Sequence, residues 1–95
     1  MTVEEVRKKT TPVLERYGVQ YAALFGSVAR GEDTPQSDVD ILVRLGRPTG
    51  MVGFMELVES LEEALGKKVD LVTEKGLNKY VRPYVMPDLK LIYEK

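Results

Sequence analysis

The spacing of apolar residues predicts an amphipathic helix in the middle of the chain. Between residues 54 and 65, apolar residues recur every three or four positions, and glutamates occupy much of the other side. The apolar positions are Phe54, Leu57, Val58, Leu61 and Leu65. Gly66 follows directly, and a glycine in this place typically ends a helix.

A second helix is predicted at the start of the chain. The Thr2 hydroxyl can accept a backbone N–H while Glu5 reaches back toward Thr2, which is the pattern of a capping box. Pro12 should kink or restart this helix because proline lacks an N–H donor, and Gly18 should end it. The residues expected to face inward are Val3, Val6, Val13, Leu14 and Tyr17.

Short apolar runs predict the remaining elements. We expect strands over Tyr21–Phe25, Asp38–Val43, Lys68–Thr73 and Leu89–Tyr93, and a short helix over Asn78–Val85 that Pro83 interrupts. This succession of helices and strands predicts an α+β domain in which helices flank one small mixed sheet. The order of the strands in that sheet does not follow from the sequence.

Length and charge narrow the class of protein. The 95 residues fit a single domain spanning residues 1–95. No apolar run approaches the roughly 20 residues of a membrane span, and the acidic first residues do not resemble a signal peptide, so we expect a cytoplasmic protein with no membrane partner. The net charge of −1 and the lack of an aromatic-rich basic groove argue against nucleic acid as a partner.

Two absent residue types narrow the chemistry further. The chain has no cysteine, which excludes disulfides and a cysteine nucleophile, and no histidine, which excludes a Ser-His-Asp triad and histidine-bound metals. Carboxylates remain as the main candidates for metal binding, and they prefer hard cations such as Mg²⁺, Mn²⁺ or Ca²⁺.

The loop after the first predicted strand is a candidate phosphate site. Gly26 lets a phosphate approach the backbone closely, and Ser27 offers a hydroxyl at the start of a possible helical turn. Taken alone, the pair is more typical of an ordinary strand-to-helix turn. A P-loop is excluded because Glu32 and Asp33 stand where Lys and Ser or Thr are required, and no Gly-x-Gly-x-x-Gly is present for a dinucleotide fold.

Three aspartates on predicted strands are candidate metal ligands. Asp38 and Asp40 are two apart on one strand, so their side chains project to the same face and repel each other unless a cation lies between them. Asp70 interrupts an otherwise apolar strand and would complete a cluster if that strand lies beside the first. Separately, each also fits a solvated residue on an exposed strand position.

Combined, these residues resemble a known family. Gly26-Ser27, ten intervening residues and Asp38-x-Asp40 match the motif of the nucleotidyltransferase superfamily with the polymerase-β-like fold. The fuller string, with Arg30-Gly31 after Gly26-Ser27 and Ser37 before Asp38, resembles the minimal nucleotidyltransferases, the MNT antitoxins paired with HEPN-domain toxins. The resemblance runs from the first helix to Asp70, and no motif residue departs from the pattern.

The resemblance implies a role for each site residue. Asp38, Asp40 and Asp70 would be catalytic and would hold one or two Mg²⁺ ions, and Asp70 would favour deprotonation of the attacking hydroxyl. Gly26 and Ser27 would bind the β- and γ-phosphates of ATP, with pyrophosphate as the leaving group. Arg30 would contact phosphate, or would instead form a structural ion pair with the neighbouring acidic residues.

The resemblance also implies an acceptor. About 25 residues follow Asp70, too few for a separate acceptor-binding domain, so the acceptor is expected on another macromolecule. For this family it is a tyrosine of a HEPN toxin, and AMP transfer silences the toxin. Candidate docking residues are Tyr80, Val81, Tyr84 and Val85, which equally fit core packing. Two alternatives stay open: a non-catalytic antitoxin that only masks its partner, and a transferase acting on a free small molecule or nucleic-acid end.

Overall fold

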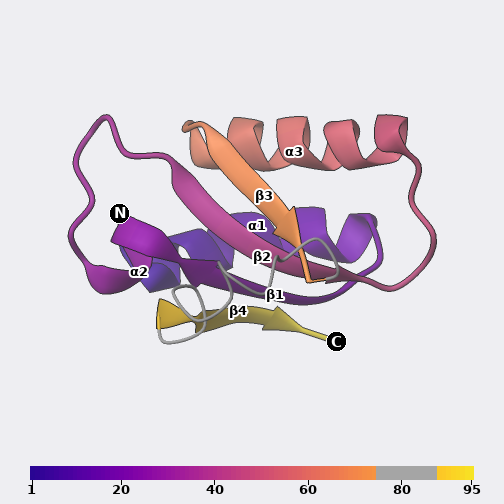
Figure 1. Ribbon diagram of the computed structural model, residues 1–95, viewed down its shortest axis with the longest axis horizontal. Helices are drawn as coiled ribbons and strands as arrows, with labels where there is room; N and C mark the ends of the chain where they lie inside the picture. The colour runs from indigo at the N-terminus through magenta and orange to yellow at the C-terminus, as the bar shows by residue number, and fades with distance from the viewer. Residues whose placement is uncertain (75–87) are drawn as a thin grey trace.

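Four strands and two long helices form a two-layer structure (Figure 1). The computed structural model describes residues 1–74 and 88–95. Its elements in chain order are α1 (Val3–Arg16), β1 (Val19–Phe25), α2 (Gly26–Arg30), β2 (Val39–Leu45), α3 (Met51–Leu65), β3 (Val69–Thr73) and β4 (Lys90–Glu94). The α+β class with a small mixed sheet is confirmed. The helix expected over Asn78–Val85 lies outside the described residues.

Local signals in the sequence set the ends of the helices. The Thr2 hydroxyl accepts a hydrogen bond from the Glu5 N–H at 3.1 Å, which begins α1 as predicted. Gly18 has a φ of 69° directly after the capping residue Tyr17, and it turns the chain into β1. The helix continues through Pro12 as one element, so the restart that the proline suggested does not occur. No helix in the described part of the chain is long and apolar enough to cross a membrane.

The sheet has the order β3-β2-β1-β4. β1 pairs antiparallel with β2 and with β4, whereas β2 and β3 are parallel and are connected through α3. Figure 1 shows that α2 lies at the same end of the sheet as the first residues of β2 and β3. Three chain segments therefore converge at this end.

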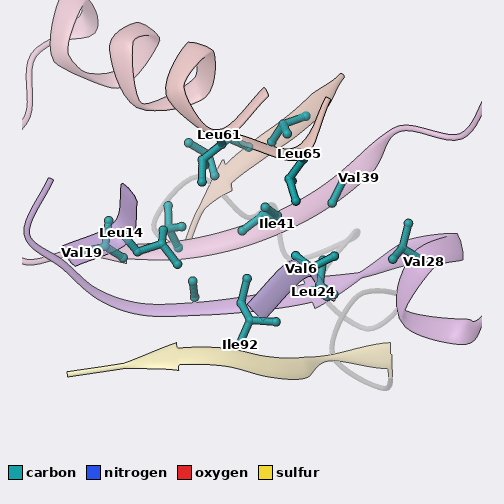
Figure 2. Packing of buried hydrophobic residues seen from close by; sticks show 14 of the residues in the cluster. Val6, Leu14, Val19, Leu24, Val28, Val39, Ile41, Leu61, Leu65 and Ile92 are labelled. Carbon is teal, nitrogen blue, oxygen red and sulfur yellow. The ribbon is translucent and has the colours of Figure 1, made fainter. Parts of the chain in front are cut away.

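The core lies between the sheet and the pair α1 and α3, which pack against each other. Figure 2 shows Leu61 and Leu65 of α3 pointing toward the sheet. Alternate residues of each strand face this layer, as the strand periodicity requires. Buried core residues from the strands are Val19, Ala22, Leu24, Val39, Ile41, Val43, Val69, Leu71 and Ile92, and those from the helices include Val6, Leu14, Leu57, Leu61 and Leu65. The residues one position along in β2, among them Asp40, face away from the helices.

We expect Leu61→Ala to lower the free energy of unfolding by about 2–5 kcal/mol, because Leu61 is fully buried between α3 and the sheet and its removal leaves a cavity. Equilibrium denaturation in urea measures this change. Val52→Ala is the control on the same helix: Val52 is 74% exposed, so its truncation should change stability by no more than about 0.5 kcal/mol. Equal effects of the two substitutions would contradict the described orientation of α3.

Candidate active site

Two of the predicted metal ligands are direct neighbours on adjacent strands. In the parallel pairing of β2 with β3, Asp40 stands opposite Asp70. Because side chains in register on parallel strands point to the same face, the two carboxylates lie side by side on the face away from the helices. Asp38 precedes β2 by one residue and Asp40 by two, so it belongs to the same row.

Gly26 lies against this pair. Phe25, the last residue of β1, is the antiparallel partner of Asp40, so the chain turns into α2 directly beside that carboxylate. Gly26 has a φ of 73°, and a Cβ placed on it would lie 2.2 Å from Oδ2 of Asp40. A side chain at this position would therefore both strain the backbone and displace the carboxylate. Ser27 follows as a half-buried residue whose hydroxyl forms no hydrogen bond with another described residue.

Electrostatic repulsion concentrates on Asp40. Burial raises the pKa of Asp40, and the negative charges of Asp70 and Asp38 raise it further, while the positive charge of Arg30 opposes this shift. Asp38 and Asp70 are exposed, whereas Asp40 is half-buried. The site therefore holds more negative charge than its own side chains neutralise.

Arg30 is held by two carboxylates at the edge of the site. Its guanidinium forms ion pairs with Asp88 at 2.9 Å and with Glu32 at 3.3 Å, and the hydrogen bonds to Asp88 and Glu32 raise its pKa. The structural ion pair with a neighbouring acidic residue is thus present in the contact with Glu32. The second partner, Asp88, is 58 residues away and was not expected. Arg30 still lies near enough to Asp40 to act on its charge.

The donor set fits a hard cation that also binds a nucleotide. All three candidate ligands are carboxylates, and the excess negative charge at Asp40 is what a divalent cation would relieve. Within residues 1–74 and 88–95, no three acidic side chains are gathered closely enough to form a metal site by themselves. Mg²⁺ sites of this kind use one or two carboxylates together with phosphate oxygens and water, so a nucleotide would complete the coordination.

Sequence reasoning missed the residues that brace this site. The ion pair of Asp88 with Arg30 could not be predicted, because no sequence pattern connects these two residues. Lys67 donates to the carbonyl oxygens of Thr34 and Ser37 in the loop before Asp38, and nothing in the sequence indicates this role.

A cavity of about 750 Å³ at the opposite end of β2 and β3 contains none of the predicted site residues. Its described lining is Val43, Arg44, Leu45, Gly46, Arg47, Pro48, Thr49, Thr73 and Glu74.

Comparison with known proteins identifies the family of the chain. A family described as a nucleotidyltransferase domain matches residues 6–92. The protein adenylyltransferase MntA of Thermococcus cleftensis is 38% identical over 93 residues, which cover 94% of this chain and 94% of the relative.

Solved structures with the same fold also match the chain. The crystal structure of a toxin–antitoxin with AMP-PNP contains a chain that matches with a TM-score of 0.80 and 26% identity, covering 94% of this chain and 73% of that one. A structure provisionally described as a minimal nucleotidyltransferase matches with a TM-score of 0.79 and 34% identity, covering 95% of both chains. The resemblance to minimal nucleotidyltransferases is confirmed, and this chain is an enzyme that belongs to the nucleotidyltransferase domain family.

Proposed function

We propose that this enzyme transfers AMP from ATP to a hydroxyl of a HEPN-type toxin, a tyrosine, and thereby acts as its antitoxin in the cytoplasm. The observation that carries the proposal is the register of Asp40 with Asp70, with Gly26 packed against Asp40. The MntA relative is named a protein adenylyltransferase, and a toxin–antitoxin structure with the same fold contains AMP-PNP. Both support AMP as the transferred group.

Each site residue has a task in this reaction. Asp38, Asp40 and Asp70 would hold one or two Mg²⁺ ions, and bound Mg²⁺ supplies charge neutralisation for the triphosphate and the leaving group. Gly26 leaves the space beside Asp40 open to phosphate, and Ser27 has a hydroxyl available to a phosphate oxygen. Arg30 adds positive charge near Asp40 from a position fixed by two ion pairs.

The transfer is an in-line displacement at the α-phosphorus. The acceptor oxygen forms a bond to this phosphorus, the bond to the bridging oxygen of the β-phosphate breaks, and pyrophosphate leaves with the electron pair. Asp70, which is exposed on the outer strand β3, favours removal of the proton of the acceptor hydroxyl. Catalysis on this scheme consists of positioning and charge stabilisation.

The acceptor is proposed to come from the partner protein. The expected docking residues Tyr80, Val81, Tyr84 and Val85 lie outside the described residues, so the surface that receives the partner stays a prediction. A partner that supplies both the hydroxyl and part of the cleft would make the isolated enzyme slow in turnover.

The central test is transfer of AMP to the partner. We expect incubation with ATP and Mg²⁺ to add one or more AMP units to the HEPN protein, as measured by intact-mass spectrometry. Asp38→Asn should slow this transfer by several powers of ten, each factor of ten corresponding to about 1.36 kcal/mol of transition-state stabilisation. Glu63→Gln is the matched control, because it makes the same carboxylate-to-amide change at an exposed position on α3.

Two outcomes would contradict the proposal. A partner that is tightly bound and inhibited but unmodified would identify a masking antitoxin without chemistry. Transfer of AMP to a free small molecule or a nucleic-acid end, with the partner unmodified, would identify a different acceptor class.

A second prediction concerns ligand binding without turnover. Mg²⁺ with ATP should raise the Tm of the parent by mass action, with a gain of about 2.7 kcal/mol in the free energy of unfolding at 100 times the Kd. The double substitution Asp38→Asn and Asp40→Asn should fold but lose this gain, because it removes ligands and repulsion together. Differential scanning fluorimetry measures both, and an undiminished gain in the double variant would contradict the assigned site.

Two glycines provide a matched pair for the role of Gly26. Both Gly26 and Gly31 have a positive φ, 73° and 72°, so an alanine at either should cost roughly 1–2 kcal/mol in backbone strain. Only at Gly26 would the new Cβ meet Asp40, since nothing lies within 4 Å of one at Gly31. We expect Gly26→Ala to lower the AMP-transfer rate about 100-fold and Gly31→Ala to leave it near the parental rate, measured per folded molecule. Equal AMP-transfer rates for the two variants would show that the space beside Asp40 at Gly26 is not needed for the reaction.

A further inference from the structure

We propose that Lys67 is a positioning residue that fixes Asp38 for binding of a divalent cation with a nucleoside triphosphate. This inference rests on the proposed function, since it assigns a task to Asp38 as a metal ligand. The basis is a contact between two segments that each lead into an aspartate. Lys67 stands in the short connection between α3 and β3, three residues before Asp70, and it reaches the loop that ends at Asp38.

Asp38 needs a support that the other two aspartates do not. Asp40 and Asp70 lie inside β2 and β3, where the parallel ladder holds their backbone. Asp38 lies one residue before β2 begins, and the first connection between the two strands here is the hydrogen bond from the Val39 N–H to the Lys68 carbonyl oxygen, at 2.9 Å. The ladder therefore stops short of Asp38, whose position depends on the loop before it.

That loop is closed by a turn on which Lys67 acts. The Ser37 N–H donates to the Thr34 carbonyl oxygen at 3.0 Å, and the Thr34 N–H donates to the Ser37 hydroxyl at 2.9 Å. The Lys67 ammonium then donates to the carbonyl oxygens of both residues, at 3.2 Å for Thr34 and 3.4 Å for Ser37. The Ser37 carbonyl belongs to the peptide group that joins Ser37 to Asp38, so the contact restrains the backbone at the aspartate itself.

The segment that carries Lys67 is anchored in turn. The Glu62 carboxylate on α3 accepts a hydrogen bond from the Val69 N–H at 2.9 Å, which holds the start of β3 against the helix. Lys67 is half-buried, whereas the adjacent Lys68 is exposed and its side chain makes no contact of this kind with the described residues. The two neighbouring lysines carry the same charge, but only the side chain of Lys67 donates hydrogen bonds to the loop.

This difference gives the experiment its control. Lys67→Met keeps the length of the side chain and removes the donors, Lys67→Arg restores donors, and Lys68→Met makes the same charge change without touching the loop. Isothermal titration calorimetry with ATP at several Mg²⁺ concentrations measures the apparent affinity. Hydrogen exchange of the amides of residues 34–38, recorded without nucleotide, measures the order of the loop independently.

We expect Lys67→Met to weaken the Mg²⁺-dependent affinity about tenfold and to accelerate amide exchange in the loop. Lys67→Arg should recover most of the affinity, and Lys68→Met should match the parent in both measurements. An equal loss of affinity in Lys67→Met and Lys68→Met would mean that the effect comes from the lost positive charge alone, and it would overturn the assignment. Unchanged amide exchange in the loop of Lys67→Met would also overturn the assignment, whether or not the affinity for ATP changes.

The same data separate this inference from the function on which it rests. A parent that binds no ATP in the presence of Mg²⁺ contradicts the proposed function itself. A parent that binds, together with a Lys67→Met variant that binds equally well, leaves the function in place and contradicts only the role of Lys67. Faster amide exchange in the loop of Lys67→Met together with an unchanged affinity would show that Lys67 orders the loop but has no role in nucleotide binding, which would overturn the inference.

Discussion

The site depends on the register between two parallel strands. Asp40 and Asp70 come together only because β2 and β3 pair so that these residues are opposite each other. A slip of one residue would turn Asp70 toward the helices, since side chains alternate between the faces of a strand. The buried residues on either side of Asp70, Val69 and Leu71, prevent that slip because they fill the layer between the sheet and α3. The hydrophobic core and the placement of the carboxylates are thus fixed by the same alternation.

This arrangement opposes the stability of the fold. Because folding raises the pKa of Asp40, its protonated form favours the folded state, and that contribution is lost as the pH rises through the raised pKa. Above that raised pKa, the ionised Asp40 destabilises the metal-free enzyme. Domains are stable by only about 5–15 kcal/mol in total, so the closely packed core on the other face of the sheet is what allows the cluster to persist. On the proposed function, a cation bound together with the nucleotide would relieve this repulsion.

The sequence predicted the elements well where local chemistry decides them. The Thr2 cap, the stops at Gly18 and Gly66 and the amphipathic pattern of α3 depend on neighbours within one or two turns, and each appears in the structure as expected. The motif residues could be located because the family spacing is specific. Strand order could not be deduced, since pairing between distant segments depends on how the whole core packs.

Contacts across the fold were likewise beyond the sequence. Arg30 and Asp88 are 58 residues apart, and no sequence pattern distinguishes Asp88 from the other acidic residues of the chain. The sequence does not distinguish Lys67 from its neighbour Lys68. Only the path of the loop before β2 brings that loop within hydrogen-bond distance of Lys67. The close approach of Gly26 to Asp40 is a further example, because it arises from the pairing of β1 with β2.

The crossover through α3 also bears on how the enzyme is made. β1 and β2 are antiparallel and close in sequence, so they can pair early at a small cost in loop entropy. The parallel partner β3 must wait until α3 has formed and packed, and contacts between distant segments are the slow ones in folding. We therefore expect a chain still emerging from the ribosome to carry the first two aspartates without the third. On the proposed function, the full set of three aspartates would therefore be assembled only in the finished fold.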